Sequence, residues 1–559
     1  MLRIHRKGVT RVLRAWVAPF LILFAPFLSY VQYHRHGLQH PDVAVFALLL
    51  AVVALVLAAG AARWPLFNVV ILAGLLTFLV DIQAKEPGLK RLGLLFLALA
   101  LVLWLLRRHA SYVVSAAMLT VVASLVLFPE RFDGTRRGPG PLSGGGGHPL
   151  VVHVLMDEMI GVGGLPADLA PPGFRERMQS FFVERGFRLF GHAYSQHVDT
   201  YYSVPQFLNL SNSEPEGLVA PGPSDGTFRL TRNEYFERFA RLGYAIKVHE
   251  PDYLYLCPED LPASCRTYAS RSLNLLDSLD MPLTAKLSVV AGTFLGQSET
   301  YTRFKTRYRK TRRRLAGVLP LPAWSWDRGL PTTASSLEMF EAASEDLAKA
   351  RAGTLVFVHV LLPHFPYVYD GNCTPRPVGE WLERWDSEAS PGTANTPQGR
   401  AARYAAYLQQ MACGERQLDR LLDSIPAALR RDAIVIVQGD HGSRIALVDP
   451  SARSREAMVP SDFADSYSTT FAVRSPWIAA DYDAEPASIA CLLRSLVDSD
   501  FRSTAAAAAC SSRTVYLQAE EGPPEAHRLP DFTTVTRGAA TPVPTTGTTG
   551  TGFQKGEAP

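Results

Sequence analysis

The sequence is poor in charged residues, which make up 19 % of its 559 positions, against roughly 25 % in soluble domains. It also lacks a strong excess of either charge: the formal net charge is +4, which gives no argument for binding to nucleic acid. Cysteine is absent before Cys257, and no Cys-x-x-Cys pair or zinc-type Cys/His spacing occurs. These absences argue against an entirely soluble chain and against a structural zinc domain.

Five apolar stretches lie near the N-terminus, each about long enough to cross a hydrocarbon core of ~30 Å. They cover 16–33, 43–62, 66–83, 92–106 and 111–128. The second contains no charged residue. A signal peptide explains one such stretch but not five in series, and the alternative of a soluble helical bundle requires polar helix faces. The sequence therefore predicts a transmembrane domain with five helices over residues 1–128.

Basic residues predict how this domain is oriented. The N-terminus carries a cluster of them: Arg3, Arg6, Lys7, Arg11 and Arg14. Such clusters stay in the cytoplasm, and in this topology Arg63 and Arg107–Arg108 also face inward, whereas Lys90 and Arg91 face outward. Five crossings then place everything after Phe128 outside.

Two later segments have the composition of flexible chain. Residues 129–148 contain Gly144–Gly147 and several prolines, and we expect a Gly/Pro-rich linker there. Residues 526–559 are rich in Thr, Gly and Pro, and we expect a disordered tail. The segment between them, 149–525, is expected to form the exported domain.

All six cysteines lie in this exported segment. An even number confined to it fits an oxidising compartment. Cys257 and Cys265 enclose a short loop, where a local disulfide is expected. The pairing of the other four is open, and free buried thiols are the alternative.

The exported segment alternates strand-like and helix-like stretches. Continuous apolar runs rich in Val occur at Leu150–Met156, Leu355–Leu362 and Ala433–Val437, and such runs predict buried parallel strands. Helical stretches such as Ser336–Arg351 and Arg400–Leu422 lie between them. This alternation predicts an α/β domain, a mostly parallel sheet with helices on both faces.

Polar residues follow each of the three strands. Asp157 and Glu158 follow the first, His364 follows the second, and Asp440 and His441 follow the third. Because ligands gather beyond the carboxyl ends of parallel strands, we expect these side chains to converge. Carboxylate and imidazole ligands suit a divalent cation. Taken singly, each has a structural alternative, such as an Asp that caps a helix.

With these residues the chain resembles the alkaline phosphatase superfamily in its sulfatase-like branch, over about 150 to 520. Asp157 after its strand, Thr200 in Thr200–Pro205, His364 within Phe357–Tyr367, and Asp440-His441-Gly442 occur in that family's order. Five membrane helices before such a domain are similar to bacterial lipid A phosphoethanolamine transferases and lipoteichoic acid synthases. The chain departs from the transferases at Asp157, where they usually carry Glu.

The resemblance implies a set of site residues. Thr200 would be the nucleophile, and with Asp157, Asp440 and His441 it would bind a divalent metal cation, zinc first, with manganese or calcium as alternatives. His364 would hold a phosphate oxygen or protonate the leaving alkoxide. Contacts to the substrate are assigned to Ser203, His197 and Arg444.

Several alternatives stay open among these residues. Ser203 is a second candidate nucleophile, although Phe207 replaces the Arg that a formylglycine sulfatase requires. Glu158 is either a second ligand or a solvated residue. His359 is interpreted as a core residue of its strand, and Asp199 either caps a helix or takes part in chemistry.

The implied function is a membrane-anchored, metal-dependent, sulfatase-like enzyme that acts on phosphate esters. It would transfer a phospho-head-group to an envelope lipid or glycan through a phosphothreonine, from the outer side of a bacterial-type inner (plasma) membrane, periplasmic or extracellular. The alternatives are a hydrolase of sulfuric or phosphoric esters and a non-catalytic, membrane-anchored binding module. The expected partners are the lipid bilayer and a lipid or glycan substrate, not nucleic acid.

One basic segment follows the apolar run Leu287–Leu295. Its members are Arg303, Lys305, Arg307, Arg309, Lys310, Arg312, Arg313 and Arg314. Basic segments beside a bilayer are attracted to anionic head groups, so the segment predicts docking on the membrane surface; a solvated helix face is the alternative.

Overall fold

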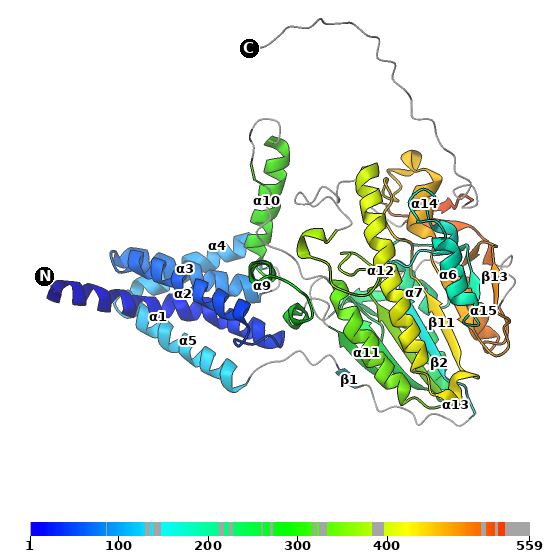
Figure 1. The fold of residues 1–559 in the computed structure, drawn as a ribbon. Helices are drawn as coiled ribbons and strands as arrows, with labels where there is room; N and C mark the ends of the chain where they lie inside the picture. The colour runs from blue at the N-terminus through cyan, green and yellow to red at the C-terminus, as the bar shows by residue number, and fades with distance from the viewer. Residues whose placement is uncertain are drawn as a thin grey trace, which may run out of the picture.

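The computed structural model describes residues 2–84, 87–128, 135–137, 147–211, 217–222, 227–258, 261–268, 272–315, 319, 321–322, 332–382, 396–504, 510–519 and 524–531. Figure 1 shows a helical bundle at the N-terminus and, beside it, a larger domain built on a sheet. We call these the N-terminal bundle (α1–α5) and the α/β domain (135–137 and 147–531).

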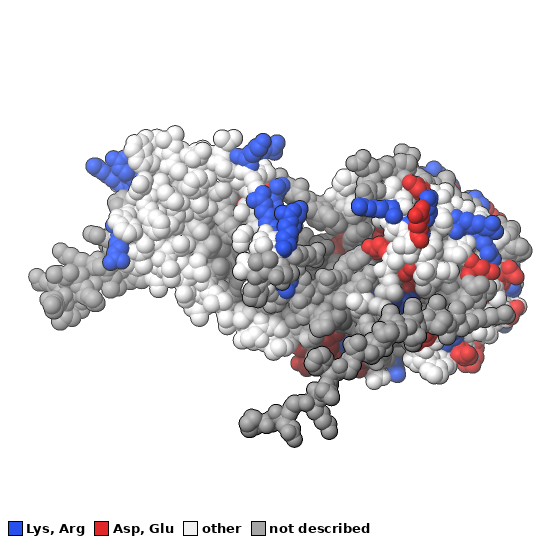
Figure 2. Space-filling view, turned by 90° about the horizontal axis from the view of Figure 1, so that it is seen from above, with Lys and Arg blue, Asp and Glu red and all other residues white. Residues whose placement is uncertain are grey.

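The N-terminal bundle consists of five helices, as expected: α1 (Leu2–Tyr33), α2 (Pro41–Ala61), α3 (Pro65–Gln83), α4 (Leu89–Leu105) and α5 (Ala110–Leu127). By length and composition, α2, α5 and the segments Ala15–Tyr33 and Leu66–Gln83 could cross a membrane. Helix α4 has 17 residues, which span about 26 Å, so its crossing stays a prediction. The face of the bundle seen in Figure 2 is mostly uncharged, with basic residues near its ends.

The α/β domain is built on a sheet of nine strands among the described residues. In spatial order they are β1 (Thr135–Arg137), β9 (Ala263–Tyr268), β7 (Ala245–Pro251), β10 (Thr354–Val360), β2 (Val151–Met156), β11 (Ile434–Gln438), β12 (Phe471–Arg474), β3 (Arg188–Phe190) and β13 (Asp481–Asp483). The central pairs β7–β10, β10–β2 and β2–β11 are parallel. The expected mostly parallel sheet is therefore confirmed, with antiparallel pairs beside β12 and at the β1 edge.

Helices cover both faces of this sheet. Every residue of β2 is buried, and alternate residues enter different cores: Val152 and Val154 join one, and Val151 and Leu155 join the other. This follows from the two-residue period of a strand. Burial on both faces explains why the strand is a continuous apolar run rather than an alternating one.

The remaining elements complete these two layers and the rim. The helices are α6 (Phe174–Val183), α7 (Thr200–Leu208), α8 (Glu234–Arg241), α9 (Leu283–Leu295), α10 (Glu299–Leu315), α11 (Ser335–Ala348), α12 (Pro397–Asp423), α13 (Ala427–Arg430), α14 (Pro460–Tyr467) and α15 (Ile489–Asp498). Small sheets are formed by β4 (Ala193–Tyr194) with β14 (Ala487–Ser488), by β5 (Val219–Pro221), β6 (Phe228–Leu230) and β8 (Leu254–Tyr255), and by β15 (Thr514–Leu517) with β16 (Glu525–Arg528).

Two expected boundaries shift. The segment expected as a linker contains β1, which pairs with β9 at the sheet edge; most of its other residues lie outside the described part. Strand β16 runs past residue 525, and Leu529 is buried, so the α/β domain continues into the start of the expected tail. Residues 532–559 also lie outside the described part.

All six cysteines are paired. The expected local disulfide joins Cys257 to Cys265. The pairing that the sequence left open is Cys373–Cys413 and Cys491–Cys510. The alternative of free thiols is therefore wrong.

Helix α9 attaches the α/β domain to the bundle, and Figure 1 shows α10 projecting away from this junction. The Phe294 ring lies 5.3 Å from that of Phe27 in α1. Just beyond α9, Ser298 donates a hydrogen bond to Asp81 of α3 at 2.5 Å. The Gly88 N–H donates to the Glu299 carboxylate at 2.8 Å.

Candidate metal centre

The strand ends bring the expected residues to one edge of the sheet. Asp157 directly follows β2, and its N–H donates to the Val360 carbonyl at the end of β10. Asp440 and His441 come two and three residues after β11, the neighbour of β2 on the other side. Because these strands are parallel and in register, their carboxyl ends meet here.

Thr200 opens α7 and places its hydroxyl among these three side chains. Its Oγ1 lies 2.7 Å from Asp440 Oδ2, 3.4 Å from Asp157 Oδ2 and 3.3 Å from His441 Nε2. All four residues are buried. Since Thr200 is the first residue of the helix, the cluster lies at the positive end of the helix dipole.

The donor set fits a metal ion. Asp157, Asp440 and His441 each offer one ligand atom, and these atoms lie within 4.8 Å of one another. Asp157 Oδ1 is buried and has no hydrogen-bond partner among the described residues, and such an orphaned carboxylate oxygen calls for a cation. Carboxylate, imidazole and hydroxyl ligands suit zinc and also the harder divalent cations.

The backbone after β11 orients two of the ligands. Asp440 Oδ1 accepts hydrogen bonds from the N–H groups of Glu158 and His441, both at 3.0 Å, which leaves Oδ2 for Thr200. His441 Nδ1 lies 3.0 Å from the Gly442 carbonyl, so Nε2 faces the cluster. Gly442 allows this packing because a Cβ there would lie 2.3 Å from the Asp465 carbonyl oxygen.

Asp157 and His441 each shift the pKa of the other toward the charged form. Burial alone would raise the pKa of Asp157, but the hydrogen bond with His359 and the charges of His364 and His441 outweigh it and lower that pKa. Burial alone would lower the pKa of His441, but the carboxylates of Asp440 and Asp157 raise it to about 10.

Glu158 lies at the inner wall of the site. It is fully buried, and neither carboxylate oxygen has a hydrogen-bond partner among the described residues. The alternative of a solvated Glu158 is therefore wrong. Burial raises its pKa. Its oxygen Oε1 lies 3.5 Å from Arg444 Nε and 3.8 Å from His364 Nε2. The expected proton donor, His364, and one expected substrate contact, Arg444, therefore flank this carboxylate.

Asp199 does not cap α7, since its side chain makes no capping hydrogen bond. Its carboxylate instead lies 3.3 Å from Arg444 Nη1. Arg444 thus spans Glu158 and Asp199 at the rim of the site.

Two expected residues are not joined to the cluster by hydrogen bonds. Ser203 Oγ, one turn after Thr200, is buried without a partner among the described residues. The His197 ring stacks between those of Tyr202 and Tyr516, at 5.6 and 4.8 Å. Burial lowers the pKa of His197 to about 4, so at neutral pH it is an uncharged part of the wall.

His359 belongs to the site, although the sequence favoured a core residue. It is fully buried in β10, yet its Nε2 lies 3.3 Å from Asp157 Oδ2. Its place near the end of the apolar run could have indicated this role, because His359 pairs with Leu155, two residues before Asp157. A side chain that hydrogen-bonds to a metal ligand in this way can fix the orientation of that ligand, here Asp157.

A second layer supports the loop that carries Asp440 and His441. Asp465 in α14 accepts two hydrogen bonds from the guanidinium of Arg400, at 2.5 and 3.1 Å. The hydroxyl of Tyr404 also donates to Asp465, and the Arg444 N–H donates to the carbonyl of Asp465 at 2.9 Å. Both hydrogen bonds from Arg400 end on Asp465 Oδ2, and charge-assisted hydrogen bonds of this kind are stronger than neutral ones.

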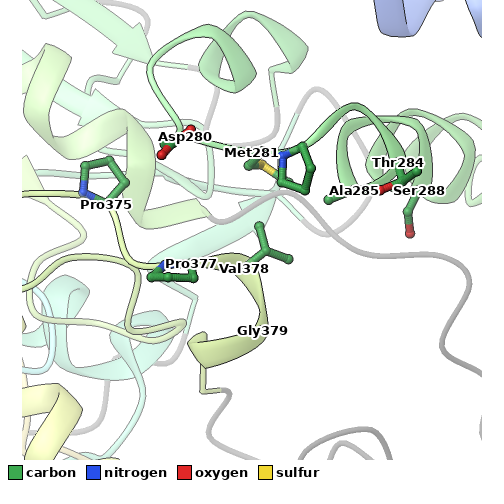
Figure 3. Close-up of a pocket in the computed structure, with 10 residues that line it drawn as sticks. Asp280, Met281, Thr284, Ala285, Ser288, Pro375, Pro377, Val378 and Gly379 are labelled. Carbon is green, nitrogen blue, oxygen red and sulfur yellow. The ribbon is translucent and has the colours of Figure 1, made fainter.

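A cavity of about 800 Å³ lies elsewhere, between the start of α9 and a loop of the α/β domain. Figure 3 shows Met281 and Ala285 on one side of it and Pro377 and Val378 on the other. None of the site residues expected from the sequence lines this cavity.

No protein-family model matches the chain, and no curated protein sequence matches it. Among solved structures, the chain is similar to a phosphonate monoester hydrolase of Agrobacterium radiobacter, with 15 % identity, a TM-score of 0.37, and coverage of 63 % of this chain and 73 % of that one. It is similar to the zinc complex of the C-terminal periplasmic domain of EcEptC from Escherichia coli, with 14 % identity, a TM-score of 0.37, and coverage of 72 % and 98 %.

A protein in the alkaline phosphatase superfamily from Vibrio parahaemolyticus matches with 14 % identity, a TM-score of 0.33, and coverage of 68 % and 75 %.

Proposed function

We propose that this chain is a membrane-anchored, metal-dependent enzyme that transfers a phospho-head-group to an envelope lipid or glycan through a phosphothreonine at Thr200. The observation that supports this most directly is the position of Thr200 Oγ1, within 3.4 Å of Asp157, Asp440 and His441 at the start of a helix. A buried threonine hydroxyl needs one hydrogen-bond partner, but this one contacts two carboxylates and an imidazole. We take this as support for a shared role of its oxygen with these three side chains.

Asp157, Asp440, His441 and Thr200 would hold the cation, zinc first, with manganese or calcium as alternatives. When bound, such a cation lowers the pKa of a coordinated hydroxyl and offsets the charge that develops on the substrate. Asp440 Oδ2, 2.7 Å from the Thr200 hydroxyl, is the oxygen placed to accept its proton.

The transfer then has two halves. In the first, Thr200 Oγ1 forms a bond to phosphorus and the bond from phosphorus to the donor oxygen breaks. The departing alkoxide takes a proton from His364, whose side chain is partly exposed beside Glu158. In the second, the acceptor alcohol attacks phosphorus and gives its proton to His364, the bond from phosphorus to Thr200 Oγ1 breaks, and Asp440 returns a proton to that oxygen. If water replaces the acceptor, the same residues perform hydrolysis.

The N–H groups at the start of α7 would hold the phosphate oxygens, as helix N-termini do for anions. Arg444 supplies positive charge at the rim, and Ser203 and His197 would shape the wall beside it. We place this reaction on the outer side of a bacterial-type inner membrane, where the lipid or glycan acceptor and the bilayer are both in reach.

Replacement of Thr200 is the decisive test. Thr200→Ala should abolish turnover of a phosphodiester donor, a loss of at least about 10²-fold, while fold and metal content remain. Mass spectrometry of protein quenched with donor should find the added mass on the peptide that contains Thr200.

Ser203→Ala is the matched control, because it removes a hydroxyl one turn along the same helix. It should leave the adduct on Thr200 in place. Full activity in Thr200→Ala, or an adduct on Ser203 alone, would move the nucleophile to Ser203. An inactive chain that never forms an adduct but still binds metal would favour the binding module.

A further inference from the structure

A second group of metal-ligating side chains lies where the N-terminal bundle meets the α/β domain. His36 and His40 lie in the link between α1 and α2, and Asp277 ends the short 3-10 helix Leu273–Asp277. One ligand atom from each lies within 4.8 Å of the others. These three residues, which we call the junction site, share no residue with the candidate metal centre.

The distances within the junction site suit one shared ion. His40 Nδ1 lies 3.3 Å from Asp277 Oδ1, and His36 Nδ1 lies 3.8 Å from Asp277 Oδ2. The two imidazole rings stack with centroids 3.9 Å apart. Ligand atoms about 2.0–2.2 Å from a tetrahedral zinc ion lie roughly 3.3–3.6 Å from one another, so small movements would complete the coordination.

A fourth residue fixes the orientation of His36. Its Nε2 lies 2.8 Å from the buried carboxylate of Asp42, at the start of α2. An Nε2–H that donates to Asp42 leaves the lone pair of Nδ1 directed at the junction site. Metal-binding histidines are commonly held in this way by a carboxylate on their other nitrogen.

The remaining nitrogen of His36, Nδ1, lies 3.8 Å from Asp277 Oδ2, which is too far for a hydrogen bond. His36 is fully buried, and its Nδ1 has no hydrogen-bond partner among the described residues. A buried nitrogen without a partner destabilises a fold, whereas a cation between His36, His40 and Asp277 would satisfy it. Asp277 is half-exposed and His40 partly exposed, which gives an ion a way in.

We propose that His36, His40 and Asp277 bind a divalent transition-metal ion, zinc being the typical case, with solvent at the fourth position. The ligands come from both parts of the molecule, so the ion fastens the α1–α2 link to the α/β domain. A hydrogen bond from Ser272 to the His34 carbonyl at 3.1 Å already joins the same two segments.

The test measures Zn²⁺ bound to the full chain in detergent, after treatment with chelator, reloading and removal of free metal. The double variant His40→Ala/Asp277→Asn should bind about one zinc fewer per chain than the unaltered protein. Neither side chain is fully buried, so the variant should fold. Asp280→Asn, an exposed acid three residues further on, is the matched control and should keep the full content.

A second background separates the two sites. Asp440→Asn/His441→Ala removes ligands of the candidate metal centre, and it should keep about one zinc per chain and show a rise in Tm on adding Zn²⁺. Adding His40→Ala/Asp277→Asn should abolish both. Unchanged zinc content in His40→Ala/Asp277→Asn would overturn the junction site, whatever the role of Thr200. Failure of the Thr200 experiment with zinc still lost from the junction variant would overturn only the proposed function.

Discussion

At the scale of single residues, His153 makes the stability of the fold depend on pH. It lies in the middle of β2, fully buried, with Nδ1 3.0 Å from the Tyr235 hydroxyl. Burial lowers its pKa to about 3 from the usual 6.5. Between those values the unfolded chain binds a proton that the folded chain does not, so the free energy of unfolding falls as pH falls, by about 1.4 kcal/mol per pH unit from this residue.

The double substitution His153→Phe/Tyr235→Phe removes this titration and leaves neither partner unpaired, so it should change stability little at neutral pH. From about pH 6 to pH 4, its free energy of unfolding should fall less steeply than that of the unaltered chain, by about 1.4 kcal/mol per pH unit. Denaturant unfolding at several pH values measures this. Tyr235→Phe alone keeps the histidine and should keep the steep slope; equal slopes in all three proteins would contradict the assignment.

Strand-end residues were predictable from the sequence, but their supporting partners were not. Asp157, Asp440 and His441 follow apolar runs, and the geometry of parallel strands is enough to bring them together. His359 sits inside such a run, and only the register of β10 against β2 shows that its ring reaches Asp157. Arg400 and Asp465 lie on different helices and are 65 positions apart in the chain, and no local pattern encodes their pairing.

At the scale of elements, α10 is the helix that carries the basic segment expected to dock on the membrane surface. The helix begins where Glu299 bonds to the Gly88 N–H, and its basic residues form the blue group between the two domains in Figure 2. In anionic nanodiscs, labelling of the exposed Lys310 by an amine-reactive reagent should be several-fold slower than in zwitterionic ones, and salt should remove the difference.

Lys349, an exposed residue just after α11, is the internal control and should react alike in both lipids. Equal labelling of Lys310 in the two lipids would leave α10 as a solvated helix face.

Buried elements were easier to predict than edge elements. The runs behind β2, β10 and β11 are apolar because both faces are covered, and each predicted strand lies within two residues of the observed one. Strand β1 is Thr-Arg-Arg in a segment rich in Gly and Pro. It becomes a strand because its backbone pairs with β9, and a pairing partner 130 positions away leaves no signal in the local sequence.

At the scale of the whole molecule, contacts between the two parts constrain the topology. The α1–α2 link reaches Ser272 and Asp277, and Gly88, in the α3–α4 link, bonds to Glu299. In the proposed membrane orientation, both links would lie on the side that holds the α/β domain. A chain that starts on the opposite side returns to this side after α5 only if α4 also crosses.

We therefore predict five crossings, although α4 spans only about 26 Å against a hydrocarbon core of ~30 Å. A phosphatase reporter that is active only outside the cytoplasm should work when fused after Gly88 and after Phe128, and should fail after Arg63 and after Arg108. A fluorescent protein that folds only inside should give the reverse pattern. The pair Gly88 and Arg108 is decisive because only α4 separates them. Equal phosphatase activity after Gly88 and after Arg108 would mean that α4 lies in the interface and does not cross. An inactive phosphatase and a fluorescent protein folded after Phe128 would place the α/β domain, with Thr200 and the junction site, inside the cell.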